Sequence, residues 1–185
     1  MRKNIKIMSL LAALFMLMPA FTSCDNDDDD DLSPAETDHV VGSYTGTMVA
    51  TVSAMGHVYD EIVMPETYTV RISAQDGVSG RVTVVLPECS YTPPGSSALE
   101  TIPSLTIDNV KVEDEGNGLY SLDKDEYTCK VGDSQYRVEI FDYDKDDKDH
   151  EDGTTIAGRD IRLVYSIVPG VMPGFINFTF TGTLK

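Results

Sequence analysis

Residues 175–183 read Phe175-Ile176-Asn177-Phe178-Thr179-Phe180-Thr181-Gly182-Thr183, and this stretch decides the fold. Large apolar side chains hold the even positions up to residue 180, while polar side chains hold the odd positions from residue 177 onward. Successive side chains of an extended strand point to opposite faces, so a period of two places one face against a core and the other against solvent. The stretch predicts a half-buried antiparallel strand.

The same alternation recurs through most of the chain from residue 40 onward. Its runs cover residues 44–52, 68–74, 82–86, 105–112, 127–131, 136–140, 161–167 and 176–184. One run changes phase between Ile107 and Val110, and a bulge at Asp108-Asn109 would return both flanking apolar pairs to one face. Turn signals separate the runs, as at Gln75-Asp76-Gly77, and no run has the period of a helix.

About eight strands without a helix predict an all-β fold, an antiparallel barrel or alternatively a two-sheet β-sandwich. In a barrel the first and last strands must pair, because an open edge of that length invites aggregation. The inward face should be the even-numbered one, with Tyr44 and Met48 in the first strand and Phe178 and Phe180 in the last. The outer face is polar, unlike that of a membrane-spanning barrel.

Residues 1–23 have the organisation of a secretory signal peptide. A basic segment, residues 1–6, precedes an apolar run from Ile7 to Met18 that is too short for a transmembrane helix. The sequence that follows, Phe21-Thr22-Ser23-Cys24, resembles the bacterial lipobox. This resemblance implies cleavage before Cys24, acylation of its thiol with fatty acids such as palmitate, and a membrane lipid anchor; ordinary cleavage, with an incidental thiol at Cys24, is the alternative.

Residues 24–39 predict an acidic, disordered tether, because the like charges of Asp27–Asp31 repel one another. The acidic run next to the cysteine also resembles the export signal of Bacteroidales-type surface lipoproteins. That resemblance implies a cell-surface position on the outer membrane, with the periplasmic face of the same membrane as the alternative.

The charge of the chain excludes several partners. Arg2, Lys3 and Lys6 lie in the signal peptide, so the mature chain has 11 basic against 31 acidic residues, a formal charge of −20. A surface this acidic does not bind nucleic acid phosphates or lie on an anionic membrane, so the acyl chains must hold it there. Residues 40–185 suit one domain, expected to be a monomer.

Two cysteines remain once Cys24 is assigned to the anchor. Cys89 and Cys129 would enclose about 40 residues if bridged, and in the chain-entropy model this disulfide stabilises by up to roughly 4 kcal/mol. An oxidising compartment permits the bond. Two separately buried thiols are an equal alternative.

The domain also resembles a known group of barrels. The opening residues 41–47, Val-Gly-Ser-Tyr-Thr-Gly-Thr, and the closing residues 175–183 are similar to the first and last strands of calycin-like (lipocalin-like) β-barrel lipoproteins of the Bacteroidales type. The resemblance spans residues 40–185 and implies a fold without a mechanism.

No motif predicts catalysis. Residues 142–153 carry seven carboxylates, and Asp142, Asp144, Asp146 and Asp149 form a weak Ca²⁺ candidate, but residues 147 and 153 break the EF-hand pattern and a solvated loop is favoured. His39, His57 and His150 lack metal-ligand spacing. We expect no cofactor and no enzyme activity, a hydrolase being the less favoured reading.

Two functions are therefore left open by the sequence. The first is a non-enzymatic envelope binding module that takes a small apolar ligand inside the barrel or a partner at its surface. The second is a structural envelope protein whose barrel is filled by its own side chains. No ligand-binding residue is identified by the pattern.

Overall fold

The computed structural model describes residues 37–54, 56–59, 61–93, 95–143, 152–169 and 174–185. The signal peptide, Cys24, the acidic tether as far as residue 36, Asp144, Asp146, Asp149 and His150 lie outside these ranges. No helix in the described ranges is long and apolar enough to cross a membrane.

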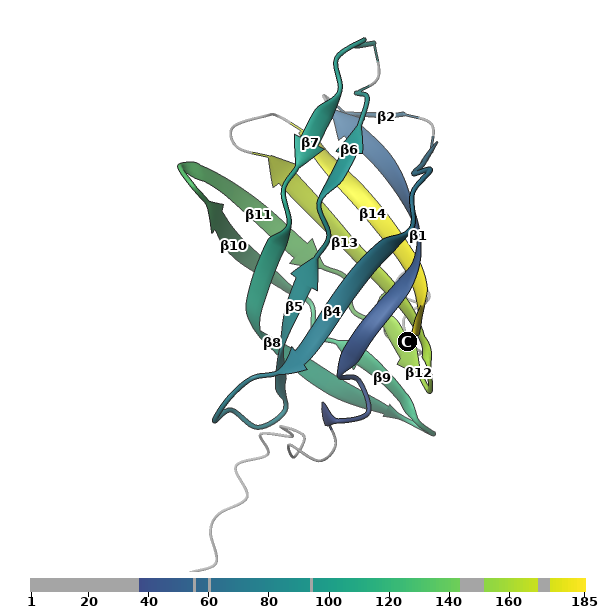
Figure 1. Ribbon diagram of the computed structural model, residues 1–185, viewed down its shortest axis with the longest axis vertical. Helices are drawn as coiled ribbons and strands as arrows, with labels where there is room; N and C mark the ends of the chain where they lie inside the picture. Colours follow the sequence, from purple (N-terminus) through teal and green to yellow (C-terminus); the bar gives the residue numbers. More distant parts are fainter. Residues whose placement is uncertain (1–36, 55, 60, 94, 144–151, 170–173) are drawn as a thin grey trace, which may run out of the picture. The chain divides into compact units, whose positions relative to one another are not determined.

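The described residues form β-strands almost throughout (Figure 1). The strands are β1 (Gly42–Ala54), β2 (His57–Val58), β3 (Ile62–Val63), β4 (Tyr68–Ala74), β5 (Arg81–Leu86), β6 (Cys89–Tyr91), β7 (Glu100–Ile102), β8 (Leu105–Gly116), β9 (Leu119–Leu122), β10 (Asp125–Val131), β11 (Ser134–Ile140), β12 (Thr155–Ala157), β13 (Asp160–Pro169) and β14 (Gly174–Leu184).

Eight of these strands close into an antiparallel barrel. The hydrogen-bonded order runs β13-β12-β9-β8-β5-β4-β1-β14, and β14 returns to β13. The first and last strands pair from Tyr44 opposite Leu184 to Ala54 opposite Gly174. The barrel prediction is confirmed, and the two-sheet sandwich is not the arrangement of this chain.

The even-numbered faces of both terminal strands point inward, as the alternation predicts. Tyr44, Met48, Phe178 and Phe180 are fully buried, and Val52 packs against the core from a partly buried position. A shift of one residue would expose the large side chains, and each would lose about 1.5–3 kcal/mol of burial free energy.

Two glycines allow β1 and β14 to approach closely near one end of the barrel. Gly46 lies opposite Gly182 in the register. A Cβ atom on Gly46 would overlap the backbone of Thr181 and Gly182. Any larger residue at position 46 would separate the two strands at the point where the barrel closes.

The bulge at Asp108-Asn109 is also confirmed. Val82 pairs with Val110 and Val84 with Ile107, so two residues of β8 lie opposite one residue of β5. Asn109 adopts a left-handed φ of 66°, which asparagine tolerates better than most residues. Its backbone N–H donates to the Gln75 side-chain oxygen at 2.6 Å, so the bulge is bonded to the β4–β5 turn.

The barrel has two different ends. At the loop end are the connection between β1 and β4, the hairpin of β6 and β7, the β10–β11 turn and the connection between β13 and β14. At the tether end β1 begins and β14 ends, beside the β4–β5, β8–β9 and β12–β13 turns. Figure 1 shows the β6–β7 hairpin projecting at the loop end.

Candidate functional site

The interior of the barrel is occupied by the protein's own side chains. The Tyr165 hydroxyl donates to the Met48 Sδ atom at 3.2 Å, and the Tyr165 ring stacks on Phe178 with 5.1 Å between ring centroids. Burial raises the pKa of Tyr165 well above its usual value, so the phenol stays neutral. Large side chains from three neighbouring strands thus pack together in the core.

Tyr44 lies in the core near the tether end of the barrel. Its hydroxyl donates to the Val40 carbonyl at 2.8 Å, and burial raises its pKa. Val40 is itself fully buried just before β1 begins. The segment that follows the tether is therefore fixed to the barrel by a buried hydrogen bond.

The wall strand beside β13 is interrupted by the acidic segment. β11 ends and β12 begins beside the same strand, since Ile140 pairs with Tyr165 and Thr155 with Arg162. Between them, the Phe141 N–H donates to the Val164 carbonyl at 3.0 Å, and the Thr154 N–H donates to the Phe141 carbonyl at 2.8 Å. β11 and β12 therefore occupy one strand position beside β13, and residues 142–153 connect them.

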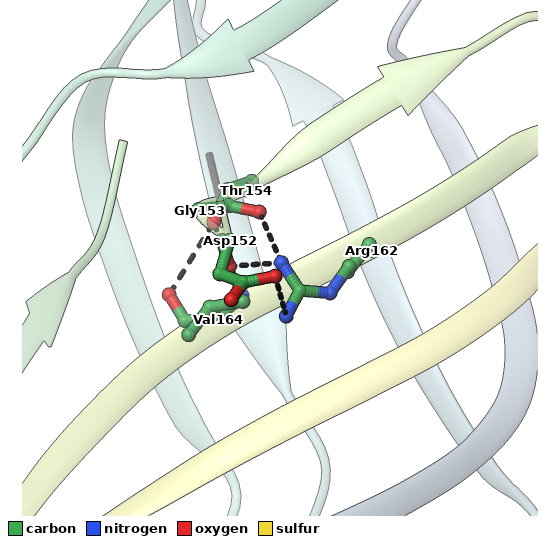
Figure 2. A network of polar contacts seen from close by, with 5 residues as sticks. All are labelled: Asp152, Gly153, Thr154, Arg162 and Val164. Carbon is green, nitrogen blue, oxygen red and sulfur yellow. Dashed lines mark hydrogen bonds and ion pairs between the residues drawn. The ribbon is translucent and has the colours of Figure 1, made fainter. Parts of the chain in front are cut away.

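Side chains complete the ladder at this junction (Figure 2). The buried Thr154 hydroxyl accepts from the Val164 N–H at 3.1 Å and lies 3.3 Å from the Val164 carbonyl, to which it donates. Arg162 donates to the Gly153 carbonyl at 3.0 Å and to the Asp152 carbonyl, and its guanidinium lies 3.5 Å from the Asp152 carboxylate. The base of the acidic loop is thus bonded to the wall.

Gly153 permits this closure because a side chain would not fit. A Cβ atom at position 153 would overlap the Asp142 carbonyl and the Tyr143 nitrogen. Of the four Ca²⁺ candidates only Asp142 is described, and no group of three or more metal-ligating side chains lies within the described ranges. The calcium candidate therefore stays a prediction.

A group of carboxylates lies beside the same loop base. Burial raises the pKa of Glu113, and the nearby charge of Asp123 raises it further, with smaller contributions from Glu115 and Asp142. Lys111, whose Nζ lies 3.7 Å from the Glu113 carboxylate, opposes the shift. The arrangement is a region of like charge on the barrel wall, and beside it the buried Ser121 hydroxyl donates to the Glu115 carboxylate at 2.7 Å.

Cys89 and Cys129 are both buried, free thiols in the structure. The Cys129 thiol donates to the Thr106 carbonyl at 3.3 Å, whereas Cys89 belongs to the β6–β7 hairpin, opposite Ile102. The two thiols therefore have different neighbours. Burial raises the pKa of Cys89 to about 11 and also raises that of Cys129.

The described histidines make ring contacts. His39 stacks on Tyr120 with 5.8 Å between ring centroids, and His57 meets the edge of Tyr59 at 4.7 Å. The two histidines come from different ends of the barrel, so the fold does not assemble them into one site.

Exposed apolar side chains gather at the loop end. Four lie on separate segments there: Val58 of β2 (65% exposed), Leu99 between β6 and β7 (69%), Val131 at the end of β10 (37%) and Phe175 at the start of β14 (43%). At the tether end, Val78 is the one large apolar side chain of the described residues that is comparably exposed (38%). The loop end is therefore the part of the barrel whose chemistry best suits contact with another molecule.

Comparison with known proteins supports the fold. No protein-family model matches the sequence, and no curated protein matches it significantly. A crystal structure of a Bacteroides fragilis NCTC 9343 protein, provisionally assigned to the outer membrane, has a similar fold with a TM-score of 0.55 and 17% sequence identity. The match covers 80% of this chain and 52% of the other, so this chain spans about half the length of that protein.

Proposed function

We propose that this protein is a lipid-anchored lipoprotein of the bacterial outer membrane that presents its barrel at the cell surface. Three observations support the outer membrane as the location. They are the lipobox-like sequence at Cys24, the adjoining acidic run, and the outer-membrane assignment of the similarly folded Bacteroides fragilis protein. The anchor attaches at the N-terminal side, and the buried Tyr44–Val40 hydrogen bond fixes the start of the domain at the tether end.

Within that location the barrel acts as a non-enzymatic binding module for a surface partner. One observation carries this proposal: four exposed apolar side chains lie on four separate segments of the loop end, at the opposite end of the barrel from the start of β1. An anchored protein presents that end away from its attachment point. Exposed apolar groups in an acidic chain favour an apolar protein surface as the partner, because an anionic surface would be repelled.

A small ligand inside the barrel is less well supported than a surface partner. Tyr165, Met48 and Phe178, from three neighbouring strands, pack against one another in the core, where a small ligand would need space. The same packing favours the second candidate, a structural envelope protein with a filled barrel. Native mass spectrometry of delipidated protein distinguishes a ligand-binding barrel from a filled one. A lipid that stays bound to the protein would favour a ligand inside the barrel.

The anchor is tested by metabolic labelling with a fatty acid. Wild-type protein should incorporate the label, and the Cys24→Ala variant should not. Label that persists in Cys24→Ala would refute acylation at this residue. A Cys89→Ala variant is the matched control, since Cys89 is buried in the barrel and should leave labelling unchanged.

Surface presentation is tested by protease accessibility on intact cells. Replacing the aspartates at 27–31 with asparagine should reduce digestion of the protein if the acidic run directs export. Replacing an equal number of acidic residues in the barrel wall controls for the change in net charge. Unchanged accessibility would leave the run as a spacer and remove the argument for the outer face.

The partner surface is tested by photocross-linking on intact cells. A photoreactive amino acid at Leu99 or Phe175 should capture a discrete partner, whereas the same residue at Val78 should not. Val78 is the matched control because it is exposed, apolar and located at the tether end. Equal yields at the two ends would contradict binding by the loop end.

A further inference from the structure

The barrel wall lacks a backbone ladder at one place. β9 pairs with β8 near the tether end, and just beyond it the Asp123 N–H donates to the Lys111 carbonyl at 3.0 Å. From there β10 continues beside β8 toward the loop end, yet it pairs with β11 and not with β8. Among the described residues, the other strands that lie side by side in the barrel are joined by ladders. We name the boundary between residues 105–110 of β8 and residues 125–131 of β10 the β8–β10 seam.

One hydrogen bond crosses the β8–β10 seam within the described residues. The buried Cys129 thiol donates to the Thr106 carbonyl at 3.3 Å, and a thiol is a weak donor. Alternate residues of an antiparallel strand bond to one neighbour, so every second residue of β10 directs its N–H and C=O toward β8. No backbone group of residues 105–110 pairs with them. The seam is therefore the least bonded line in the wall.

The bulge in β8 explains why the ladder stops. The Asn109 N–H donates to the Gln75 side-chain oxygen at 2.6 Å, and the Asn109 carbonyl accepts from the Arg81 guanidinium at 3.0 Å. Both backbone groups of Asn109 are thus bonded on the β4–β5 side of β8, and neither is offered to β10. A bulge also bends its strand and disrupts the ladder locally. The bulge therefore ends the pairing of β8 with the strand position that β9 and β10 share.

The β10–β11 hairpin is attached to the barrel along its other side. Seven residue pairs join its two strands to each other, and five pairs join β11 to β13. Figure 1 shows the tip of the hairpin standing away from β8 at the loop end. A hairpin that is bonded within itself and along one side can move as one unit about the β11–β13 ladder.

The inner side of the seam is apolar. Leu105 and Ile107 of β8 and Cys129 of β10 are buried, and Tyr127 packs against the core from a partly buried position. Movement of β10 away from β8 would uncover these side chains without breaking a backbone ladder. A molecule that enters there meets no charged side chain among the four, so a small apolar solute suits the opening best.

We propose that the barrel opens along the β8–β10 seam, with the β10–β11 hairpin as a flap, and admits a small apolar solute from the side as far as Cys129. Local openings of a fold follow its least bonded boundaries. Cys129 is 5% exposed in the closed barrel, so a solute reaches its thiol only when the flap moves. The inference uses the barrel wall alone and stands without the proposed anchor or surface partner.

Labelling of Cys129 with N-ethylmaleimide, a small apolar thiol reagent, tests the opening. Positions 128 and 130 are the outward ones on either side of Cys129, and Thr106 points outward on β8. Thr106→Cys is therefore combined with Thr128→Cys or with Lys130→Cys. Oxidation of the purified exported protein should close one of these pairs and hold the seam shut. The labelling rate of Cys129, read by mass spectrometry of its peptide, should then fall at least tenfold and recover when the bridge is reduced.

The matched control is a bridge across a ladder. Thr47→Cys with Thr181→Cys joins directly paired, exposed positions of β1 and β14, and its oxidation should leave Cys129 labelling unchanged. Labelling of Cys89, which lies in the β6–β7 hairpin, should stay unchanged in the seam-locked protein. Equal Cys129 labelling in the seam-locked and control-locked proteins would overturn the proposal. Failure of both seam pairs to oxidise would overturn it too, because β8 and β10 would then not face each other.

The wild-type protein gives a second measurement that needs no substitution. A local opening exposes little surface, so the Cys129 labelling rate should stay nearly constant as urea is raised below the unfolding transition. A labelling rate that rises with urea as steeply as the unfolded population would mean that the thiol is reached by global unfolding. That result would refute the flap.

Discussion

The rings of Tyr165 and Phe178 stack 5.1 Å apart at directly paired positions of β13 and β14. Phe178 is fully buried, whereas its neighbour Thr179 points outward and is partly exposed. Removing the Phe178 ring leaves a cavity against Tyr165 and also removes the stacking interaction.

We expect Phe178→Ala to lower the free energy of unfolding by about 3–5 kcal/mol, with Thr179→Ala close to neutral. Urea denaturation of the two variants beside the wild type measures both values. Equal effects would mean that the inward face of β14 is wrongly assigned.

The loop junction gives a second prediction. Thr154→Val keeps the shape of the side chain and removes the hydroxyl that bonds the Val164 backbone. Leaving that backbone group unpaired should cost about 1–3 kcal/mol of unfolding free energy. Thr181→Val, at an exposed position of the barrel wall, is the matched control and should change stability by less than about 0.5 kcal/mol.

The two barrel thiols should be free and unreactive in the folded protein. With a pKa of about 11, Cys89 is a thiolate in roughly one molecule in three thousand at pH 7.5, and only the thiolate reacts. Alkylation should be slow in the native state, and two thiols should react after denaturation without reductant. A denatured, non-reduced protein without free thiols would show that the exported form carries the bridge.

Glu113 should make the stability depend on pH. Burial raises its pKa above the ordinary 4.5, so the folded state holds the proton more tightly than the unfolded state. Stability is then lost as the pH rises from the unfolded-state pKa through the folded-state pKa.

Glu113→Gln abolishes this loss, so its melting temperature relative to the wild type should be higher at pH 7 than at pH 4. The Glu139→Gln variant controls for general charge reduction. A difference that is the same at both pH values, or larger at pH 4, would reverse the assigned sign.

The sequence could predict those features that depend on side-chain alternation. The terminal strands, their inward faces and the Asp108–Asn109 bulge follow from the position of apolar residues along the chain, because burial decides which face turns inward. Closure could be predicted as well, since an unpaired terminal strand of that length would be exposed to aggregation.

Other features depend on contacts that no local pattern encodes. Arg162 alternates with apolar residues in the run 161–167 and Thr154 lies outside every predicted run, so only the pairing of β13 with both β11 and β12 gives them their role. The cysteine count suggested a bridge as readily as two thiols, because sequence spacing does not give side-chain direction.

The junction at Phe141 and Thr154 has a consequence for how the protein can be engineered and can diversify. Because those two residues are hydrogen-bonded and the wall continues beside Val164, the length of the intervening segment does not enter the closure of the barrel. Closing a longer loop costs little, about 0.6 kcal/mol for each doubling of its length. An epitope or a small domain inserted between Asp142 and Asp152 should therefore be tolerated without unfolding of the barrel. New functions could be added at this junction while the barrel stays unchanged.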